Sequence, residues 1–479
     1  MEVQELLKLY AAHPQVTALD TLLKNDTSRN IFLKGLNGSG PAMTIASLFT
    51  KGRGSYVCVL NDQEEAGYFY HDLMQLTASN EVYFFPSAYR RAIKYGHVDP
   101  ANEILRTEVL SRLQDPDASF VIVTYPDALA ERVVAREVLK ENTLKISVGE
   151  KLDNMFVSDV LDEYGFEQVD YVYEPGQYAL RGSILDVFSF SYEFPYRIDF
   201  FGDEVETIRT FDVETQLSKE KLDSIYIVPE MSKNAKDSTS LLGSLPRNTC
   251  IAARDLAWCK ERIGSVWNDD PVVADEESFA DIDQMRKKLV RGEDFLREVL
   301  DFRRIHFGAR PMGTADATIH FSTQTQPIYH KNFDRVSESF HKYLDEGYTL
   351  YILSDQEKQA NRIRMIFEDR GDNIPFTAVN RTIHEGFADD TLRICFFTDH
   401  QLFDRFHKFN LKSDKARSGK ITLSLKELNQ FSQGDYIVHI DHGVGQFGGL
   451  VRTEVNGKMQ EAIKLIYQNN DIIFVSIHS

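Results

Sequence analysis

A glycine-rich loop near the start of the chain is the clearest candidate for phosphate chemistry. The loop spans residues 35–44 (GLNGSGPAMT), follows an apolar run and opens a helix-like stretch. A nucleotide-hydrolysing loop has the pattern GxxxxGK[ST], in which Lys reaches the β- and γ-phosphates and the Ser or Thr hydroxyl holds Mg²⁺. Gly35 and Gly40 have this spacing, but Pro41 and Ala42 replace the two functional residues. We therefore predict no nucleotide cofactor here, and only weak anion binding at the helix N-terminus stays open. The degenerate loop comprises Gly35, Gly38, Gly40 and Thr44 as its glycine and hydroxyl positions.

Two other groupings could carry chemistry, and both favour a structural interpretation. Asp203 and Glu204 could hold Mg²⁺ at the end of a buried strand, but they follow Gly202 in a predicted hairpin turn. His439 and His442 have metal-ligand spacing, but in a strand-to-turn context the two rings point to opposite faces. The sequence contains no GxSxG or HExxH motif. We therefore predict no metal site and no catalytic residue in this chain.

Composition is that of an ordinary globular protein. The chain has 479 residues, of which 42% are hydrophobic and 27% charged, and its length predicts about three or four domains. Four scattered cysteines form no CxxC pair, so they indicate neither zinc nor a disulfide framework. No apolar run approaches the length of a membrane span, and Met1-Glu2-Val3 opens no signal peptide. A reducing cytosol fits these features.

Net charge restricts the kinds of partner. The chain carries 54 Lys and Arg against 73 Asp and Glu, for a formal charge of −19. Sequence-independent DNA binding depends on neutralising phosphates with Lys and Arg. The chain as a whole is therefore a poor DNA binder, although a local basic groove stays open, and protein partners are the better expectation.

The elements that must position these residues begin with an α/β region over residues 1–140. Its alternation of strands and helices predicts a parallel sheet covered by helices. The expected strands are 31–33, 56–60, 82–85 and 120–124, and the expected helices are 41–49, 65–76 and 100–113.

A β-rich block follows, and its clearest part runs from Tyr173 to Asp212. Tyr196, Ile198 and Phe200 alternate with polar residues, and turn residues separate the runs. We expect an antiparallel sheet with one face open to water, preceded by a strand at 169–174. From pattern alone, a structural sheet is favoured over a docking surface centred on Arg181.

The remaining sequence alternates again between helical and β-rich stretches. Residues 278–306 are strongly helical with a break near Gly292, and 308–327 are irregular. A second α/β unit follows, in which Phe333, Val336, Phe340 and Leu344 mark one helix. Its other expected elements are strands at 348–353 and 392–398 and a helix at 356–370. Residues 412–420 (KSDKARSGK) read as a linker, and strands of a small barrel are expected at 436–440, 446–455, 462–467 and 472–477.

Two blocks resemble a known family. The positions of Tyr178, Arg181, Gly182, Asp186, Phe188, Pro195, Arg197, Asp199, Phe200, Phe201 and Gly202 resemble those of bacterial transcription-repair coupling factors, and excinuclease B shares a looser version. The segment GDYIVHIDHGVGQFGGL (434–450) resembles the RNA-polymerase-interaction domain of the same family, a Tudor-like barrel shared with CarD-type regulators. Segments 84–100 and 121–133 support the resemblance.

The resemblance implies an α/β multidomain fold. A degenerate P-loop-type parallel α/β module, similar to excinuclease B, would carry an inserted antiparallel β domain. A second small α/β domain and a Tudor-like β-barrel, left incomplete, would follow. The implied boundaries are 1–144 and 213–310 for the module, 145–212 for the inserted domain, 311–327 and 411–425 for linkers, 328–410 for the spacer domain and 426–479 for the barrel.

The resemblance also implies function and partners. The full-length family protein is an ATP-driven DNA translocase that displaces stalled RNA polymerase and recruits excinuclease A for nucleotide excision repair. The expected partners of this chain are excinuclease A and the polymerase β subunit, with no membrane. ATP, Mg²⁺ and DNA would bind an absent C-terminal motor, so we expect no enzyme activity in this chain and a bacterial cytoplasmic location.

Site residues carry over from the matching positions. Arg181 matches the family arginine implicated in excinuclease A docking, with Phe188 and Arg197 as neighbours. Some members carry an upstream basic residue, whereas residues 165–169 here have none. In the barrel, the strand that lies against polymerase is expected at Val451, Arg452, Thr453 and Glu454, where Thr453 is more polar than the expected apolar residue. The alternatives are a nucleotide-binding module and a direct DNA-binding module related to excinuclease B.

Overall fold

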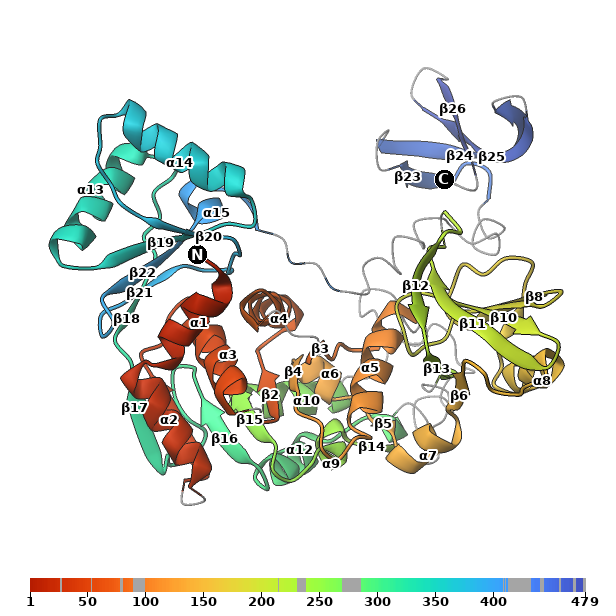
Figure 1. Cartoon of the computed structure of the whole chain (residues 1–479), viewed down its shortest axis with the longest axis horizontal. Helices are drawn as coiled ribbons and strands as arrows, with labels where there is room; N and C mark the ends of the chain where they lie inside the picture. Colours follow the sequence, from red (N-terminus) through yellow and green to blue (C-terminus); the bar gives the residue numbers. More distant parts are fainter. Residues whose placement is uncertain are drawn as a thin grey trace. The chain divides into compact units, whose positions relative to one another are not determined.

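The computed structural model divides the chain into two compact units (Figure 1). The first unit comprises Met1–Ile146, Ser189–Tyr192 and Ser224–Lys412, and the second comprises Ser147–Phe188, Glu193–Asp223 and Ser413–Ser479. The β-rich segment is therefore inserted between parts of the first unit. The structure describes residues 1–25, 28–52, 54–77, 81–88, 100–213, 215–230, 238–268, 286–407, 409, 411, 432–439, 443–455, 458–467 and 471–476.

A seven-stranded sheet, all parallel among the described residues, lies at the centre of the first unit. Its strand order is β17-β1-β16-β15-β2-β4-β3. The bounds are β1 (Asn30–Lys34), β2 (Tyr56–Val59), β3 (Val82–Phe84), β4 (Val121–Thr124), β15 (Cys250–Ala253), β16 (Arg303–His306) and β17 (Ala317–His320). The four strands expected in the first 140 residues and their parallel arrangement are confirmed. The last three strands come from sequence after the β-rich segment and complete the sheet.

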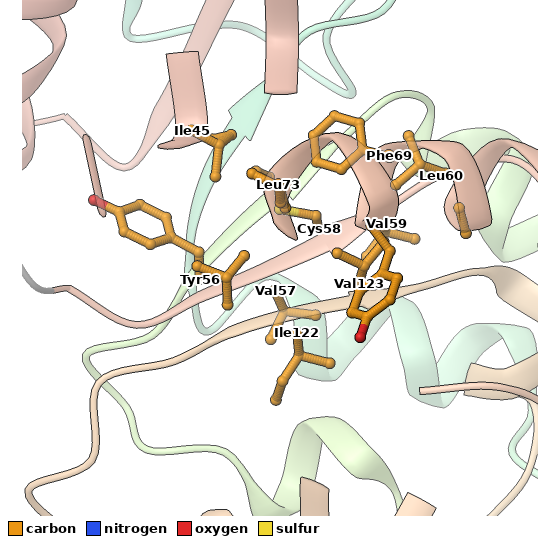
Figure 2. Packing of buried hydrophobic residues seen from close by; sticks show 14 of the residues in the cluster. Ile45, Tyr56, Val57, Cys58, Val59, Leu60, Phe69, Leu73, Ile122 and Val123 are labelled. Carbon is orange, nitrogen blue, oxygen red and sulfur yellow. The ribbon is translucent and has the colours of Figure 1, made fainter. Parts of the chain in front are cut away.

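Helices pack against this sheet through apolar side chains. Figure 2 shows Leu73 of α4 beside Cys58 on one side of β2 and Ile122 of β4 beside Val57, all of them buried. Burial of each such side chain stabilises the fold by about 1.5–3 kcal/mol. The main helices are α1 (Val3–Ala11), α2 (Pro14–Lys24), α3 (Gly40–Gly52), α4 (Gln63–Thr77), α5 (Pro100–Arg112), α10 (Leu256–Asn268) and α12 (Gly292–Val299). Shorter elements are α6 (Pro126–Leu129), α7 (Arg136–Glu141), α9 (Leu241–Ser244) and the strand pairs β5 (Val133–Val134) with β14 (Ser238–Thr239) and β6 (Leu144–Ser147) with β13 (Ser224–Ile227).

The second α/β domain belongs to the same unit. Its five-stranded sheet has the order β18-β21-β22-β19-β20 among the described residues, and Val336 and Phe340 are buried as the helical stripe predicts. Phe387 and Phe396 join the core of the first sheet, where both rings contact Tyr10 of α1. The bounds are β18 (Thr323–Thr325), α13 (Phe333–Asp345), β19 (Thr349–Leu353), α14 (Glu357–Asp369), β20 (Thr377–Val379), β21 (Phe387–Asp389), β22 (Ile394–Thr398) and α15 (Asp399–Leu402).

The second unit contains two largely antiparallel sheets, which we describe separately. The first has the order β12-β11-β10-β9-β8-β7 and packs one face against α8 (Asn154–Glu163), whose Val157 and Leu161 are buried. Its strands are β7 (Glu167–Gln168), β8 (Gln177–Arg181), β9 (Ile184–Val187), β10 (Tyr196–Phe201), β11 (Glu204–Phe211) and β12 (Ser218–Leu222). The other is a meander of β23 (Tyr436–His439), β24 (Gly443–Val455), β25 (Lys458–Ile466) and β26 (Ile472–Ser476), close to the predicted strands.

Three expectations about elements are wrong. The strand predicted at 169–174 is absent, and β7 is a two-residue strand parallel to β8. The helix predicted through residues 303–306 is wrong, because these residues form β16, whereas the predicted break near Gly292 is present as a non-helical stretch at 288–291 before α12 begins. Residues 311–327 were predicted to be an irregular linker. They instead contain β17 and β18, and each of these strands extends a sheet. Residues 269–285 and 412–420, which bear on the predicted helix and the second linker, lie outside the described residues.

Candidate functional site

One face of the inserted sheet carries a row of alternating charges. Strand periodicity directs Tyr196, Ile198 and Phe200 inwards, as expected, and the intervening residues of β10 outwards. Asp186 of β9 lies on this open face between two arginines. Arg197 donates to it from Nε (2.7 Å) and Nη2 (2.8 Å), and Arg181 donates from Nη2. The two guanidinium groups cover the carboxylate so fully that Asp186 is 0% exposed.

The row continues on β10 and β11. Arg209 Nη2 donates to Asp199 Oδ2 at 2.5 Å, and Thr207 Oγ1 donates to the same oxygen at 2.9 Å. Arg197 also lies 4.2 Å over the ring of Phe211, and its hydrogen bonds to Asp186 raise the pKa of the guanidinium further above its usual value. Arg197 Nη1 also donates to the Gln216 carbonyl at 3.2 Å. The central arginine is thereby fixed on three sides, which makes it a supporting residue more than an exposed one.

Arg181 is the more accessible of the paired arginines. Its side chain is 35% exposed, compared with 14% for Arg197. Its guanidinium lies 5.1 Å over the ring of Tyr171 and donates to the Asp170 carbonyl at 2.9 Å. Tyr171 is itself 53% exposed. An arginine held against an exposed aromatic ring is typical of interface hot spots.

Two members of this surface were not predicted as site residues. Tyr171 falls within the strand wrongly expected at 169–174, and no local signal places it over Arg181. Phe201 is 78% exposed, and its phase in β10 matches Arg197 and Asp199, so alternation alone could have identified it. We call Tyr171, Arg181, Asp186, Arg197 and Phe201 the arginine face.

Phe188, a predicted docking neighbour, does not reach this surface. Its side chain is 2% exposed, and its backbone N–H donates to the Gln177 carbonyl at 2.9 Å. Phe188 is therefore part of the packed interior and offers no contact area to a partner.

The glycine-rich loop joins β1 to α3, as the sequence predicts. Gly35 and Gly38 have φ of +90° and +53°, conformations that favour glycine. Thr44 is buried, and its Oγ1 donates to the Gly40 carbonyl at 2.9 Å. Its hydroxyl is therefore turned into the helix instead of towards a metal position.

Protein atoms accept hydrogen bonds from the amides of this loop. The Asn37 N–H donates to Thr323 Oγ1 at 2.9 Å, and the Ser39 N–H donates to the Glu385 carbonyl at 3.0 Å. The adjacent cavity of about 350 Å³ is lined by five carboxylates, and its one cation, Arg254, is paired with Glu65. Negative charge and committed donors both disfavour phosphate. The acidic lining residues are Asp62, Glu64, Glu65, Asp72 and Glu385.

The C-terminal sheet presents a strand edge at the predicted polymerase contact. Val451, Arg452, Thr453 and Glu454 pair with Ala462, Glu461, Gln460 and Met459 of β25. Strand β23 pairs only with residues 443–446 of β24. Within the described residues, the second edge of β24 over 451–455 therefore has no strand beside it, and such an edge can accept an added strand.

The remaining chemical candidates gain no support from the described residues. Asp203 and Glu204 follow the positive-φ turn at Gly202 and are exposed, as the hairpin prediction requires. His442 lies outside the described residues. Within those residues no group of three or more His, Cys, Asp or Glu side chains has metal-binding geometry, and no helix is long and apolar enough to cross a membrane.

Comparison with known proteins first defines a class. Residues 144–232 match the UvrB interaction domain, which contains the arginine face, and residues 431–479 match the CarD-like/TRCF RID domain, which contains the open edge of β24. The chain thus combines regions that resemble these two interaction domains with further α/β sequence.

Comparison with whole proteins then shows which proteins combine both regions. The chain is 23% identical over 548 aligned residues to the transcription-repair-coupling factor of Staphylococcus aureus (strain bovine RF122 / ET3-1), covering 96% of this chain and 46% of the relative. It is 23% identical over 524 aligned residues to that of Bacillus subtilis (strain 168), covering 93% and 44%. These matches confirm the resemblance to transcription-repair coupling factors, over the N-terminal portion. The chain spans less than half the length of these relatives.

Proposed function

We propose that this chain is the front portion of a transcription-repair coupling factor and acts as a two-ended adaptor. One end, the arginine face, recruits excinuclease A. The other end, the RID-like sheet, binds the β subunit of RNA polymerase. The observation that carries the proposal is the partly exposed Arg181, held against exposed Tyr171 inside the region that matches the UvrB interaction domain.

The arginine face can recognise a partner through a carboxylate and an apolar contact. Arg181 is committed on one side to Asp186 and the Asp170 carbonyl, which leaves its outer edge for an acidic group. Tyr171 and Phe201 supply apolar area beside it. Because Asp186 and the Asp170 carbonyl fix the Arg181 guanidinium before binding, little side-chain entropy is lost when the partner docks.

At the other end, strand addition fits the open edge of β24. A β-strand of polymerase pairing with residues 451–454 would satisfy backbone groups of that edge. The four-stranded sheet would belong to a Tudor-like barrel, and the α/β module would descend from a phosphate-loop protein that has lost its nucleotide. The amides committed to Thr323 and Glu385 support this last point.

Activity of the whole protein follows from the same proposal. A motor outside this chain would bind ATP, Mg²⁺ and DNA, translocate on the template and displace stalled polymerase in the bacterial cytoplasm. This chain would contribute partner selection and no hydrolysis. The acidic cavity beside the glycine loop and the net charge of −19 both disfavour nucleotide or DNA as its direct ligand.

A two-partner binding assay tests the adaptor. The full 479-residue chain, immobilised, is challenged separately with excinuclease A and with RNA polymerase. We expect Arg181→Glu to abolish capture of excinuclease A and leave polymerase capture unchanged, which also verifies folding. Arg297→Glu, a similar charge reversal at a residue whose side chain is 78% exposed on α12, should retain both. Undiminished capture of excinuclease A by Arg181→Glu contradicts the assignment of the arginine face.

A further inference from the structure

The glycine-rich loop is engaged by oxygen atoms of the second α/β domain. Thr323 Oγ1 accepts from the Asn37 N–H at 2.9 Å and donates to the Gly35 carbonyl at 2.8 Å. The Asn37 side chain adds a hydrogen bond from Nδ2 to the Thr323 carbonyl at 2.8 Å. One residue of β18 therefore satisfies one backbone donor and one backbone acceptor of the loop.

A second contact engages the end of the loop that begins α3. The Ser39 N–H donates to the Glu385 carbonyl at 3.0 Å, and the Glu385 N–H donates back to Ser39 Oγ at 3.0 Å. Ser39 Oγ in turn donates to Asp72 Oδ2 at 2.5 Å, and the other oxygen of Asp72 accepts from the His384 N–H at 2.7 Å. The helix N-terminus thus receives a carbonyl oxygen where such termini commonly receive a phosphate oxygen.

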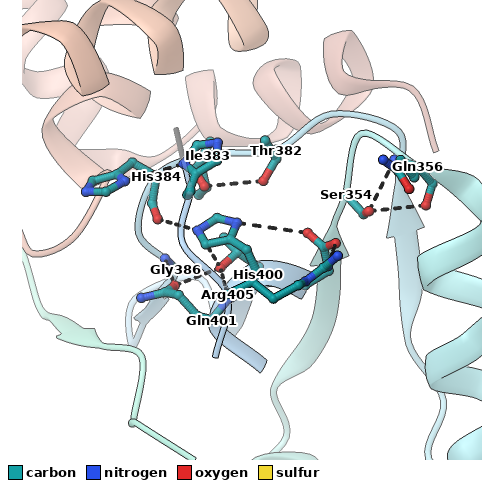
Figure 3. Close-up of polar contacts among 12 residues, drawn as sticks. Ser354, Gln356, Thr382, Ile383, His384, Gly386, His400, Gln401 and Arg405 are labelled. Carbon is teal, nitrogen blue, oxygen red and sulfur yellow. Dashed lines mark hydrogen bonds and ion pairs between the residues drawn. The ribbon is translucent and has the colours of Figure 1, made fainter. Parts of the chain in front are cut away.

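The segment that supplies this carbonyl is fixed by its own domain. Figure 3 shows Gln401 and His400 of α15 holding residues 384–386. The Gly386 N–H donates to Gln401 Oε1 at 2.7 Å, and His400 Nε2 lies 2.8 Å from the His384 carbonyl. The Glu385 carbonyl is therefore presented by a preorganised turn.

Close backbone approach makes the contact specific. A Cβ on Gly38 would lie 2.9 Å from the Gly386 carbonyl oxygen, and a Cβ on Gly386 would lie 2.1 Å from Gln326 Oε1. Glycine at position 38 lets the two backbones meet, and glycine at position 386 lets the turn that carries Glu385 pack within its own domain. The loop glycines, which in a phosphate loop admit the ligand, here admit another part of the protein.

We propose that the degenerate loop is an internal receptor whose ligand is the second α/β domain, with the Thr323 hydroxyl and the Glu385 carbonyl in place of phosphate oxygens. Nucleotide and this domain then compete for the same backbone donors. The two α/β domains are held together without nucleotide input, and restoring the two missing loop residues does not restore ATP binding while the domain is docked.

Hydrogen exchange of the loop amides in the full chain tests the receptor directly. We expect slow exchange at Asn37 and Ser39 in the wild type, unaffected by millimolar Mg-ATP. Gly386→Ala should accelerate exchange at Ser39 at least tenfold, whereas Gly264→Ala on α10, where a Cβ meets nothing within 4 Å, should not. Fast exchange at both amides of the wild type, or unchanged exchange at Ser39 in Gly386→Ala, overturns the proposal.

Two further variants keep the test independent of gross unfolding. Thr323→Val keeps the side-chain shape and removes the hydroxyl, so exchange should accelerate at Asn37 while Ser39 stays protected. Thr318→Val, at an exposed position of β17, is the matched control. The double variant Pro41→Lys/Ala42→Thr rebuilds the nucleotide pattern, and isothermal titration should show no Mg-ATP binding. If this variant binds Mg-ATP with micromolar affinity while its loop amides stay protected, nucleotide and the second α/β domain do not compete for the loop.

Discussion

The glycine loop and the arginine face differ in what the folded chain does with their binding groups. The loop has amide donors, a helix N-terminus and glycines at the right places, yet its donors are satisfied by Thr323 and Glu385. The arginine face has groups partly satisfied by Asp186, yet Arg181 keeps a third of its side chain exposed beside Tyr171.

Residue spacing therefore defines the capacity to bind, whereas tertiary contacts decide whether the binding groups are available. The loop keeps the backbone shape of a phosphate site but directs it inwards, to a ligand within the chain. The face uses a buried carboxylate to hold arginines in position and directs them outwards. A sequence can therefore reveal a binding motif, but it does not reveal whether another part of the chain already occupies the motif's binding groups.

Removing the carboxylate that organises the arginine face should have the largest effect. Asp186→Ala leaves Arg197, whose side chain is 14% exposed, without its carboxylate partner. Breaking such a pair should lower the local stability of β9 and β10 by about 3 kcal/mol. Hydrogen exchange of the β9 and β10 amides measures this loss, with Asp203→Ala in the exposed turn as the control. A loss below about 1 kcal/mol would mean that the arginines do not depend on this carboxylate.

Local periodicity predicted much of the architecture. Alternation in β10 and the apolar runs at 56–60 and 120–124 encode which side chains are inside, and those elements form where expected. The helical stripe at Val336 and Phe340 is equally direct. These features depend on residues within one or two turns of each other, so the sequence contains the whole signal.

Features that depend on distant residues could not be predicted. Thr323 and Glu385 are 286 and 346 residues from their partners in the loop. The local pattern predicts a helix through residues 303–306, although their place between β1 and β15 makes them a strand. The burial of Phe188 depends on how neighbouring strands cover it. No local pattern encodes any of these pairings, because the partner comes from another part of the chain.

A histidine cluster lies beside the contact between the glycine loop and the second α/β domain. Its titration should make the stability of this region depend on pH. His407 lies 3.4 Å from His384 through their Nδ1 atoms and stacks on His400 with ring centroids 4.3 Å apart. Burial lowers the pKa of His71 and His384 to about 4 and that of His400 to about 3. These histidines are held neutral in the folded state.

The sign of the pH effect follows from these shifts. A histidine with a lowered pKa contributes full stability above its unfolded pKa of about 6.5, and this contribution declines as pH falls towards 4. Burial raises the pKa of Asp72 to about 7, so its contribution changes in the opposite sense, falling as pH rises from about 4 to 7. With three histidines against one carboxylate, the cluster should lose about 2 kcal/mol or more between pH 6.5 and 5.

Urea unfolding followed by tryptophan fluorescence measures this loss, because Trp258 and Trp267 both lie in the first unit. His400→Gln can keep a hydrogen bond to the His384 carbonyl but cannot titrate. It should reduce the pH slope of the unfolding free energy by about 1 kcal/mol per pH unit. His341→Gln, at an exposed position, should keep the wild-type slope. An unchanged slope in His400→Gln would show that this histidine is not part of the titrating cluster.

A smaller effect should distinguish the contribution of the Tyr171 ring, which holds Arg181 in position, from the contribution of the Arg181 charge. Tyr171→Ala removes the ring under Arg181 while leaving its pair with Asp186. We expect excinuclease A to bind about fivefold more weakly, which corresponds to about 1 kcal/mol for an exposed cation–π contact. Surface plasmon resonance gives the ratio. Tyr226→Ala, which removes a comparably exposed tyrosine near Lys145, should bind as the wild type does; equal losses in both variants would indicate a non-specific effect.

The smallest expected effect compares two exposed phenylalanines, one in each unit. Phe201 on the arginine face and Phe406 in the first unit are 78% and 82% exposed. Replacing either with Ser removes little buried area, so both variants should keep their unfolding free energy within about 0.5 kcal/mol. Only Phe201→Ser should weaken excinuclease A binding, by roughly two- to threefold, because only Phe201 shares a face with Arg181. Equal affinities for the two variants would confine the docking surface to Arg181 and Tyr171 and exclude the β10–β11 end of the sheet from it.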